Sequence, residues 1–527
     1  MASTIPPRAD GRTWLGLAVL VLPALLLSLD LTVLNLAIPK LTAELRPTGA
    51  QLLWILDIYP LVLAGLLIPM GALGDRIGRR RLLLVGAAAF GAASVFAAFS
   101  ANAEMLIVAR GLLGVAGSTV MPSTLSLIRN MFRDPKQRTL AISVFMSGIM
   151  VGDAIGPAVG GVLLEYFWWG SVFLLGVPVM LLVIALGPAL LPEYRDPAPG
   201  RLDLTSAALL VATMLAVVFS LQHLGEAGLD PLSPVVLVIG LGLGVVFVRR
   251  QRRLADPLLD LRLFANRSFT VGAVVITLGL GAMFGAYYFM AQYLQLVAGL
   301  SPFQAGLATI PITLGSVGGI ALLPLLTRWF RPARVMVGGL VVAALGMVVI
   351  TLVNAGGGIA FLVIGGVLLF IGLGITLSLC TTMILNSVPA EKAGAASGVQ
   401  ETSAEMGAAL GIAVLGSIGT AVYRGGVGGA LPEGLPADLL HSAQGTLGGA
   451  VAAAAHLPGA TGAELLDTAR QAFTTGMRIS TGIGVAVLLG LAVMAAVRLR
   501  GETLDGQLAD DLPEAVTTTP DKEQTGG

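Results

Sequence analysis

The sequence predicts an all-helical integral membrane protein. Of its 527 residues, 56% are hydrophobic and only 12% are charged, and the mean hydropathy is +0.89. Soluble domains carry about 25% charged residues, so this chain has too few charges to cover a water-facing surface of its size. Long apolar runs recur along the chain, and only helices or closed barrels satisfy their backbone groups in lipid. We therefore expect a bundle of membrane-spanning helices.

Fourteen apolar runs, most of them close to the roughly 20 residues that cross the hydrocarbon core as a helix, make up most of the chain. In chain order they cover 14–38, 51–72, 82–100, 103–128, 139–164, 170–191, 203–222, 234–248, 268–296, 303–327, 335–353, 359–386, 396–422 and 471–497. The first run is too long for a cleaved signal peptide. An arm, 1–13, precedes it, and the polar segment 501–527 is typical of a disordered tail. The longest connection is the external segment 423–470, with a short helix expected near 463–469.

The positions of the basic residues predict the orientation of these spans, because short cytoplasmic loops are enriched in Lys and Arg. An even number of spans puts both termini on one side of the membrane. If that side is the cytoplasm, 25 of the 31 basic residues fall in the arm, the inner loops or the tail. The exceptions are Lys40, Arg46, Arg424 and Arg470 outside, and Arg110 and Arg478 within spans. We therefore expect a multi-pass protein of the cell's inner membrane with both termini in the cytoplasm, in contact with the lipid bilayer.

Several function classes receive no support from the composition. A formal net charge of +1 gives no electrostatic reason to expect a nucleic-acid partner. The single cysteine, Cys380, and three scattered histidines do not have the spacing of a metal site. The sequence contains no Walker-type nucleotide loop and no recognisable set of nucleophile, base and oxyanion donors. We expect no metal, no bound cofactor and no enzymatic activity.

The loop between the second and third runs has a specific order of small, acidic and basic residues. Its G-x-x-G-D-R-x-G-R-R-R pattern consists of Gly71, Gly74, Asp75, Arg76, Gly78, Arg79, Arg80 and Arg81. Such a loop can latch helix ends together, whereas the simpler interpretation is positive charge that fixes the topology. A weaker echo, without the acid, occurs at Thr327, Arg328 and Arg331.

This echo indicates an internal repeat. The repeat predicts two six-helix bundles, 14–191 and 268–497, with an additional helix pair, 203–248, inserted between them.

The fifth run carries small residues at four-residue spacing, which allow two helices to approach closely. The ridge consists of Gly148, Gly152, Gly156, Pro157, Gly160 and Gly161, and its proline removes one backbone donor. Tight packing without a further role also explains this pattern.

Ionisable residues inside the predicted spans are the strongest functional signal. Five acids well inside their spans give this signal, together with Arg110: Asp30, Asp57, Asp153, Glu401 and Glu405. Each would cost about 3 kcal/mol at the bilayer centre, so we expect them to be paired, protonated or exposed to a wet cavity. Glu401 and Glu405 are four residues apart on one helix face, where their mutual repulsion favours the binding of a proton. Asp153 lies about 100° around its helix from the glycine ridge, and its role stays open.

Aromatic side chains in the second run accompany one of these acids. Trp54 and Asp57 are three residues apart, which places an aromatic ring beside a carboxylate, and a lipophilic cation could use both. Anchoring at the membrane interface is the alternative interpretation of Trp54 and Tyr59.

Together these motifs resemble the major facilitator superfamily, and in particular its fourteen-helix drug:proton antiporters of the quaternary ammonium and ethidium type. The resemblance runs from about Trp14 to Arg500. It is carried by the charged loop, the G-P-x-x-G-G end of the fifth run, and the segments 29–39, 54–59, 109–117, 167–173 and 400–407. Some such exporters have an acid in the tenth helix, but 304–327 has none.

The resemblance implies roles for individual residues. The charged loop, with Gly71, Asp75, Arg76, Gly78, Arg79 and Arg80, would form the cytoplasmic gate. The ridge Gly148, Gly152, Gly156, Pro157, Gly160 and Gly161 would be the antiporter motif. Proton coupling would fall to Asp30 and Glu405 with Arg110, and contact with substrate to Trp54, Asp57, Tyr59 and Glu401.

We therefore expect a monomer that exports lipophilic, cationic drugs, antiseptics or dyes from the cytoplasm by alternating access, driven by the proton gradient. Its partners would be these small molecules, protons and lipid. Two alternatives stay open. The chain could export an endogenous antibiotic or metabolite, or it could be a non-transporting membrane sensor on a transporter scaffold.

Overall fold

The computed structural model describes residues 9–195, 203–227, 230–254, 257–388, 393–428 and 443–499. Within these ranges the chain is almost entirely helical, and the one β feature is an isolated bridge between Asn354 and Gly357. The predicted tail, 501–527, and most of the predicted N-terminal arm lie outside the described residues.

Fourteen helical segments in the described part of the chain are long and apolar enough to cross a membrane, as the sequence predicts. The first six use α1 (Gly11–Leu45), α2 (Gly49–Ile77), α3 (Arg79–Ala98), α4 (Ala103–Met131), α5 (Pro135–Tyr166), and α6 (Ser171–Leu174) joined to α7 (Gly176–Leu190). The next two are α8 (Leu204–Ala227) and α9 (Leu232–Arg253). The last six use α10 (Arg267–Gln292) with η2 (Tyr293–Val297), α11 (Pro302–Trp329), α12 (Pro332–Thr351), α13 (Ile359–Asn386), α14 (Ala393–Val427) and α17 (Gly459–Arg498).

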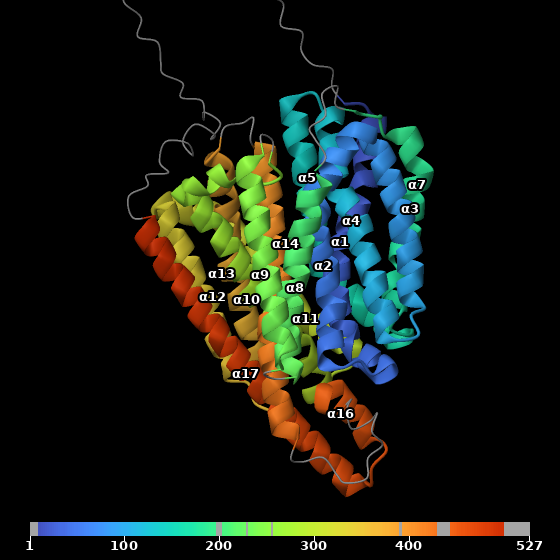
Figure 1. The fold of residues 1–527 in the computed structure, drawn as a ribbon, viewed down its shortest axis with the longest axis vertical. Coiled ribbons are helices and arrows are strands. Elements are labelled where there is room, and N and C mark those ends of the chain that lie inside the picture. Colours follow the sequence, from blue (N-terminus) through green and yellow to red (C-terminus); the bar gives the residue numbers. More distant parts are fainter. Residues whose placement is uncertain are drawn as a thin grey trace, which may run out of the picture.

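Two bundles lie side by side, one containing α1 to α7 and the other α10 to α17 (Figure 1). The inserted hairpin, α8 and α9, lies where they meet. A separate hydrophobic cluster joins α8 to a helix of each bundle. It consists of Leu61 and Ala64 on α2, Met214 and Val218 on α8, and Ala409 and Ala413 on α14.

The glycine ridge of α5 packs in two directions. A Cβ at Gly152 or Gly156 would overlap Ser28 or Thr32 of α1, so these glycines allow α1 and α5 to lie in close contact. At the far end of α5, a Cβ at Gly161 would lie 2.8 Å from the carbonyl oxygen of Pro302, at the start of α11. Small residues therefore bring together both neighbours within the first bundle and the two bundles themselves.

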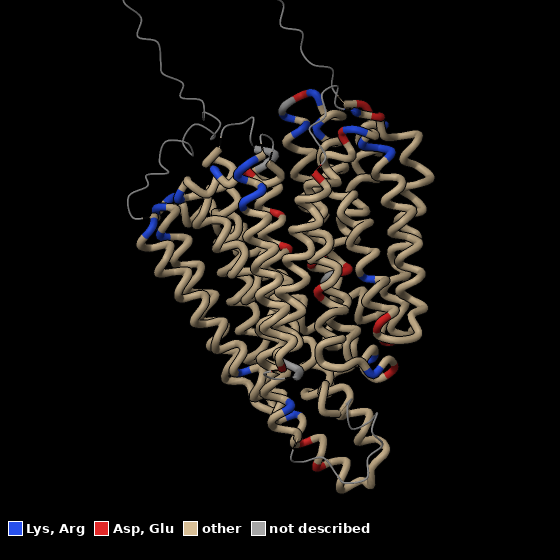
Figure 2. Tube along the Cα trace, viewed as in Figure 1, with Lys and Arg blue, Asp and Glu red and all other residues tan. Residues whose placement is uncertain are grey.

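Basic residues gather at one end of the bundle (Figure 2). Most of the described lysines and arginines lie at the end where α1 begins and α17 ends, and few of them lie at the opposite end. The fold therefore groups the basic residues as the sequence predicts.

The connection 423–470 differs from the sequence-based expectation. The helix expected near 463–469 is the first part of α17, which runs without a break for 40 residues from Gly459. Together with α16 (Leu447–Ala454) it extends beyond the rest of the bundle (Figure 1). The predicted span starts just after Arg470, because charged residues are unfavourable in lipid. The helix itself starts earlier, since it can extend into water past the membrane boundary. Residues 429–442 of this connection lie outside the described residues.

Candidate functional site

A cavity of about 540 Å³ lies between the two bundles. Its walls come from α1, α2, α4 and α5 on one side and from α10, α11, α13 and α14 on the other. This volume is in the range of sites for drug-sized ligands. The cavity therefore occupies the position at which a small molecule would contact both bundles at once.

Three carboxylic acids line this cavity: Asp153 on α5, and Glu401 and Glu405 on α14. No lysine, arginine or histidine is among the described residues that line it. Glu401 and Glu405 face the same space, as their spacing predicts. Glu405 and Asp153, on opposite bundles, are close enough to interact electrostatically. Whatever their protonation, these side chains offer oxygen acceptors to a ligand and no positive charge.

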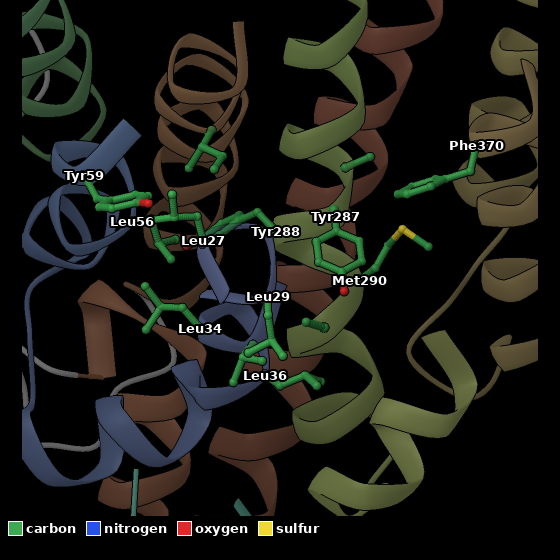
Figure 3. Close-up of a cluster of buried hydrophobic side chains, with 14 of the residues drawn as sticks. Leu27, Leu29, Leu34, Leu36, Leu56, Tyr59, Tyr287, Tyr288, Met290 and Phe370 are labelled. Carbon is green, nitrogen blue, oxygen red and sulfur yellow. The ribbon is translucent and has the colours of Figure 1, made fainter. Parts of the chain in front are cut away.

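The remaining walls are mainly aromatic and apolar. Tyr59, Phe284, Tyr287 and Phe370 contribute rings, and Met121, Met150 and Met283 contribute thioethers. Figure 3 shows Tyr59 of α2 and Phe370 of α13 on opposite sides, with Leu27 of α1 and Tyr287 of α10 between them. Rings and flexible thioethers adapt to flat apolar ligands of varied shape and are favourable neighbours for a cation.

A buried ion pair lies behind one of these rings. Arg110 on α4 contacts Asp30 on α1 with a nitrogen–oxygen distance of 2.5 Å, and 1% of the Arg110 side chain is exposed. Arg110 also donates a hydrogen bond to the carbonyl of Ile55 on α2 at 3.1 Å. Its guanidinium lies 4.5 Å from the centre of the Tyr59 ring. The sequence-predicted residues Asp30, Tyr59 and Arg110 are thus in one contact network, with Tyr59 connecting the ion pair to the cavity.

Asp57 and Trp54 face away from the cavity. Asp57 is fully buried and accepts a hydrogen bond from Nε2 of Gln222 on α8 at 2.6 Å. The Trp54 ring lies 6.4 Å from that of Phe219, also on α8. The contact with substrate that the sequence suggested for these two residues is not supplied by this arrangement and stays a prediction.

Asp153 is a cavity residue to which the sequence assigned no role. The glycine ridge of α5 faces α1, so a side chain about 100° away from it points past α1 and into the space between the bundles. Helical periodicity gives the angle between Asp153 and the glycine ridge, but it does not show what lies at that angle.

The charged loop lies between α2 and α3, at the arginine-rich end. Asp75 accepts a hydrogen bond from Nε of Arg79 at 2.8 Å, and Arg79 also donates to the carbonyl of Pro122 on α4 at 3.3 Å. Gly78 has a φ of 111°, a conformation that other residues rarely adopt. A Cβ on Gly71 would lie 3.6 Å from the Pro122 side chain, an ordinary contact distance, and Arg76 is exposed.

Glu193, which follows α7, completes this loop and was not identified from the sequence. It accepts a hydrogen bond from the backbone N–H of Arg80 at 3.1 Å, and its carboxylate lies 3.6 Å from the Arg80 side chain. An acid at the start of a helix is favoured by the unpaired N–H groups there. The connection toward α8 is therefore fastened to the loop that starts α3.

Comparison with known proteins identifies the family of this chain. Residues 20–412 match the model of the Major Facilitator Superfamily. The chain belongs to this superfamily. It is therefore a membrane transporter rather than an enzyme, as the sequence predicted.

Similar proteins are efflux and resistance proteins. The chain is 45% identical to the multidrug efflux pump LfrA of Mycolicibacterium smegmatis, over 94% of this chain and 97% of LfrA. It is 36% identical to the methyl viologen resistance protein SmvA of Salmonella typhimurium, over 92% and 97% of the two chains. It is 29% identical to the tetracenomycin C resistance and export protein of Streptomyces glaucescens, over 96% and 95%.

Solved structures support the fold. A bacterial homologue of the human lysosomal transporter Spinster, in an inward-facing and unoccupied conformation, superposes with a TM-score of 0.65 at 18% identity, covering 93% of this chain and 99% of that one. The peptide transporter POT in complex with sulfate gives a TM-score of 0.59 at 17% identity, covering 92% and 95%.

The ion pair generates a prediction about stability. Arg110→Met leaves Asp30 without its cation in a buried site, which should destabilise the protein by about 3–5 kcal/mol. The double variant Asp30→Asn with Arg110→Met removes both charges and should recover most of that loss. Thermal unfolding of the purified variants, monitored by size-exclusion chromatography, measures the loss of stability and its recovery. Equal destabilisation of the single and double variants would show that the charge interaction is not what Arg110 contributes.

Proposed function

We propose that this transporter exports lipophilic cations from the cytoplasm in exchange for protons. The observation that carries the proposal is the cavity between the bundles, which combines three carboxylic acids and aromatic walls with no basic residue among the described residues that line it. Ionised carboxylates attract a cation, and the rings bind its apolar body and part of its charge. A cavity of this composition disfavours anions, so the selection is for positive charge together with apolar surface.

Exchange follows from competition between a proton and a cation for the same acids. A ligand shifts the balance between two conformations only by binding one of them more tightly. Glu405, inside the cavity, would hold either a proton or the substrate's charge. Asp30 would be the second proton-coupling acid, because Tyr59 contacts Arg110 on one side and lines the cavity on the other. A proton on Asp30 would weaken its hold on Arg110 and so change the position of Tyr59.

The orientation is part of the proposal. The arginine-rich end would face the cytoplasm, as the rule for short loops requires, in the inner membrane and with both termini inside. At the opposite end the two bundles are joined, since Gln295 donates a hydrogen bond to the carbonyl of Leu36 at 3.0 Å and Phe303 donates to Glu165 at 3.3 Å. This state would therefore be closed to the outside and would load substrate from the cytoplasm.

The names of the relatives agree with this proposal at different levels of detail. A multidrug pump at 45% identity and a methyl viologen resistance protein at 36% favour efflux of varied compounds, and methyl viologen is itself a cation. A second candidate is export of an antibiotic made by the same cell, because one relative at 29% identity is named for tetracenomycin C export. The acidic cavity favours the first. We expect the protein to act as a monomer, since the cavity is formed within one chain.

Removal of the coupling acids should abolish exchange. In energised inside-out vesicles, we expect Asp30→Asn and Glu405→Gln to reduce ethidium uptake roughly tenfold or more, equivalent to losing at least about 1.4 kcal/mol of interaction. Ethidium-driven proton release should fall with it. Glu104→Gln, an exposed acid at the start of α4, is the matched control and should transport normally. If Asp30→Asn and Glu405→Gln both show the parental rates of ethidium uptake and proton counterflow, the assignment of these acids to proton coupling is contradicted.

Asp153 should determine how well doubly charged substrates are transported. It faces Glu405 from the other bundle, so a dication can meet an acid on each side. We expect Asp153→Asn to lower methyl viologen uptake about tenfold and tetraphenylphosphonium uptake much less, because only the former loses the partner of its second charge. An equal loss for both cations would refute this role. Competition of each cation with ethidium measures the two effects in the same vesicles.

A further inference from the structure

A second buried acid lies outside the cavity, at the contact between the first bundle and the inserted hairpin. Asp57 on α2 is fully buried, and Gln222 on α8 is 1% exposed. Nε2 of Gln222 donates a hydrogen bond to Oδ2 of Asp57 at 2.6 Å. Neither side chain lines the cavity.

Each member of this pair retains one buried acceptor. Oδ1 of Asp57 and Oε1 of Gln222 make no hydrogen bond with any described residue. A carboxylate and an amide oxygen cannot bond to each other, because both are acceptors. Buried polar atoms are normally hydrogen-bonded, and leaving one unsatisfied costs about 1–3 kcal/mol. The two unsatisfied acceptors lie on side chains that contact each other, so a single cause would explain both.

No neighbouring cation balances a charge on Asp57 within the described structure. Tyr288 of α10 interacts electrostatically with Asp57, and Tyr59 lies two residues further along α2. Asp30 (α1), Arg110 (α4) and Glu405 (α14) interact with Tyr59, and His223 follows Gln222 on α8. Of the two that can be positive, Arg110 is paired with Asp30, and His223 contacts Asp230 at 3.2 Å. An ionised Asp57 would therefore be a buried charge without a partner, which costs several kcal/mol.

One proton resolves both problems. A hydrogen on Oδ1 of Asp57 would be donated to Oε1 of Gln222, while the existing bond from Nε2 to Oδ2 stays in place. The two side chains then form a closed pair of hydrogen bonds between a carboxylic acid and an amide. We infer that Asp57 and Gln222 share a bound proton, and that this proton fastens the inserted hairpin to α2 of the first bundle.

The position of α8 gives this proton a mechanical consequence. Through Met214 and Val218, α8 also packs against Ala409 and Ala413 of α14, so the hairpin contacts both bundles. If Asp57 loses its proton to water, its carboxylate faces an amide oxygen and repels it. Hydration of that carboxylate requires α8 to move away from α2. Proton release and undocking of the hairpin are therefore linked, whether or not the cavity carries cations.

Infrared spectroscopy of the purified full-length protein in lipid tests the proton directly. The spectrum of the parent minus that of Asp57→Asn should show the carbonyl band of a hydrogen-bonded carboxylic acid at neutral pH. The asparagine variant should fold, because its amide can form the same two bonds with Gln222. Gln222→Leu, or Gln222→Met if the leucine variant fails to fold, should shift the band to the higher frequency of a free acid. Absence of an acid band in the first difference spectrum overturns the inference.

Disulfide formation tests the linkage to docking. A Cβ on Gly65 of α2 would lie 3.4 Å from the Cβ of Val211 on α8, close to the separation in a disulfide. Two proteins are compared in a Cys380→Ser background: both carry Gly65→Cys and Val211→Cys, and the second also carries Asp57→Asn. We expect the rate of disulfide formation in the first, divided by the rate in the second, to fall as the pH rises. The division removes the effect of pH on thiol reactivity. A ratio that does not change with pH overturns the linkage. Ethidium transport is not part of either readout, so failure here is distinct from failure of the export proposal.

Discussion

The cost of placing charge in hydrocarbon is the constraint on which this structure depends. The five acids deep in the spans and Arg110 meet it in three ways. Asp30 and Arg110 neutralise each other between α1 and α4. Asp57 is hydrogen-bonded to an amide of the inserted hairpin. Asp153, Glu401 and Glu405 face a cavity that separates them from lipid. Each solution lies at a contact between helices, so the charges also determine which helices must stay together.

Close helix packing makes these solutions possible. The glycines of α5 bring its backbone against α1, and its last turn approaches the start of α11 in the other bundle. With α5 held between the bundles, Asp153 can project into the space that they share. The glycine ridge, which the family resemblance associated with exchange, is thus the scaffold of one cavity wall.

The sequence predicted the number of spans and the grouping of basic residues, because hydropathy and loop charge are local properties. It also placed Glu401 and Glu405 on one face, since helical periodicity fixes that relation. It did not reveal which neighbour each face meets. Asp57 and Asp153 show this in opposite ways: the first lies against α8, whose position depends on tertiary packing, and the second faces the cavity. Glu193 could not be assigned because its partner, the Arg80 backbone, is distant in the chain.

Exchange at the acids between the bundles requires that water from the cytoplasm reaches them. Ser378 lines the cavity, whereas Ala409 is buried in the contact of α8 with α14. In a Cys380→Ser background, a membrane-impermeant maleimide added to inside-out vesicles should modify the protein with Ser378→Cys rapidly and the protein with Ala409→Cys hardly at all. If the two positions react equally slowly, with both proteins folded, the cavity is not accessible from the cytoplasm and the account is contradicted.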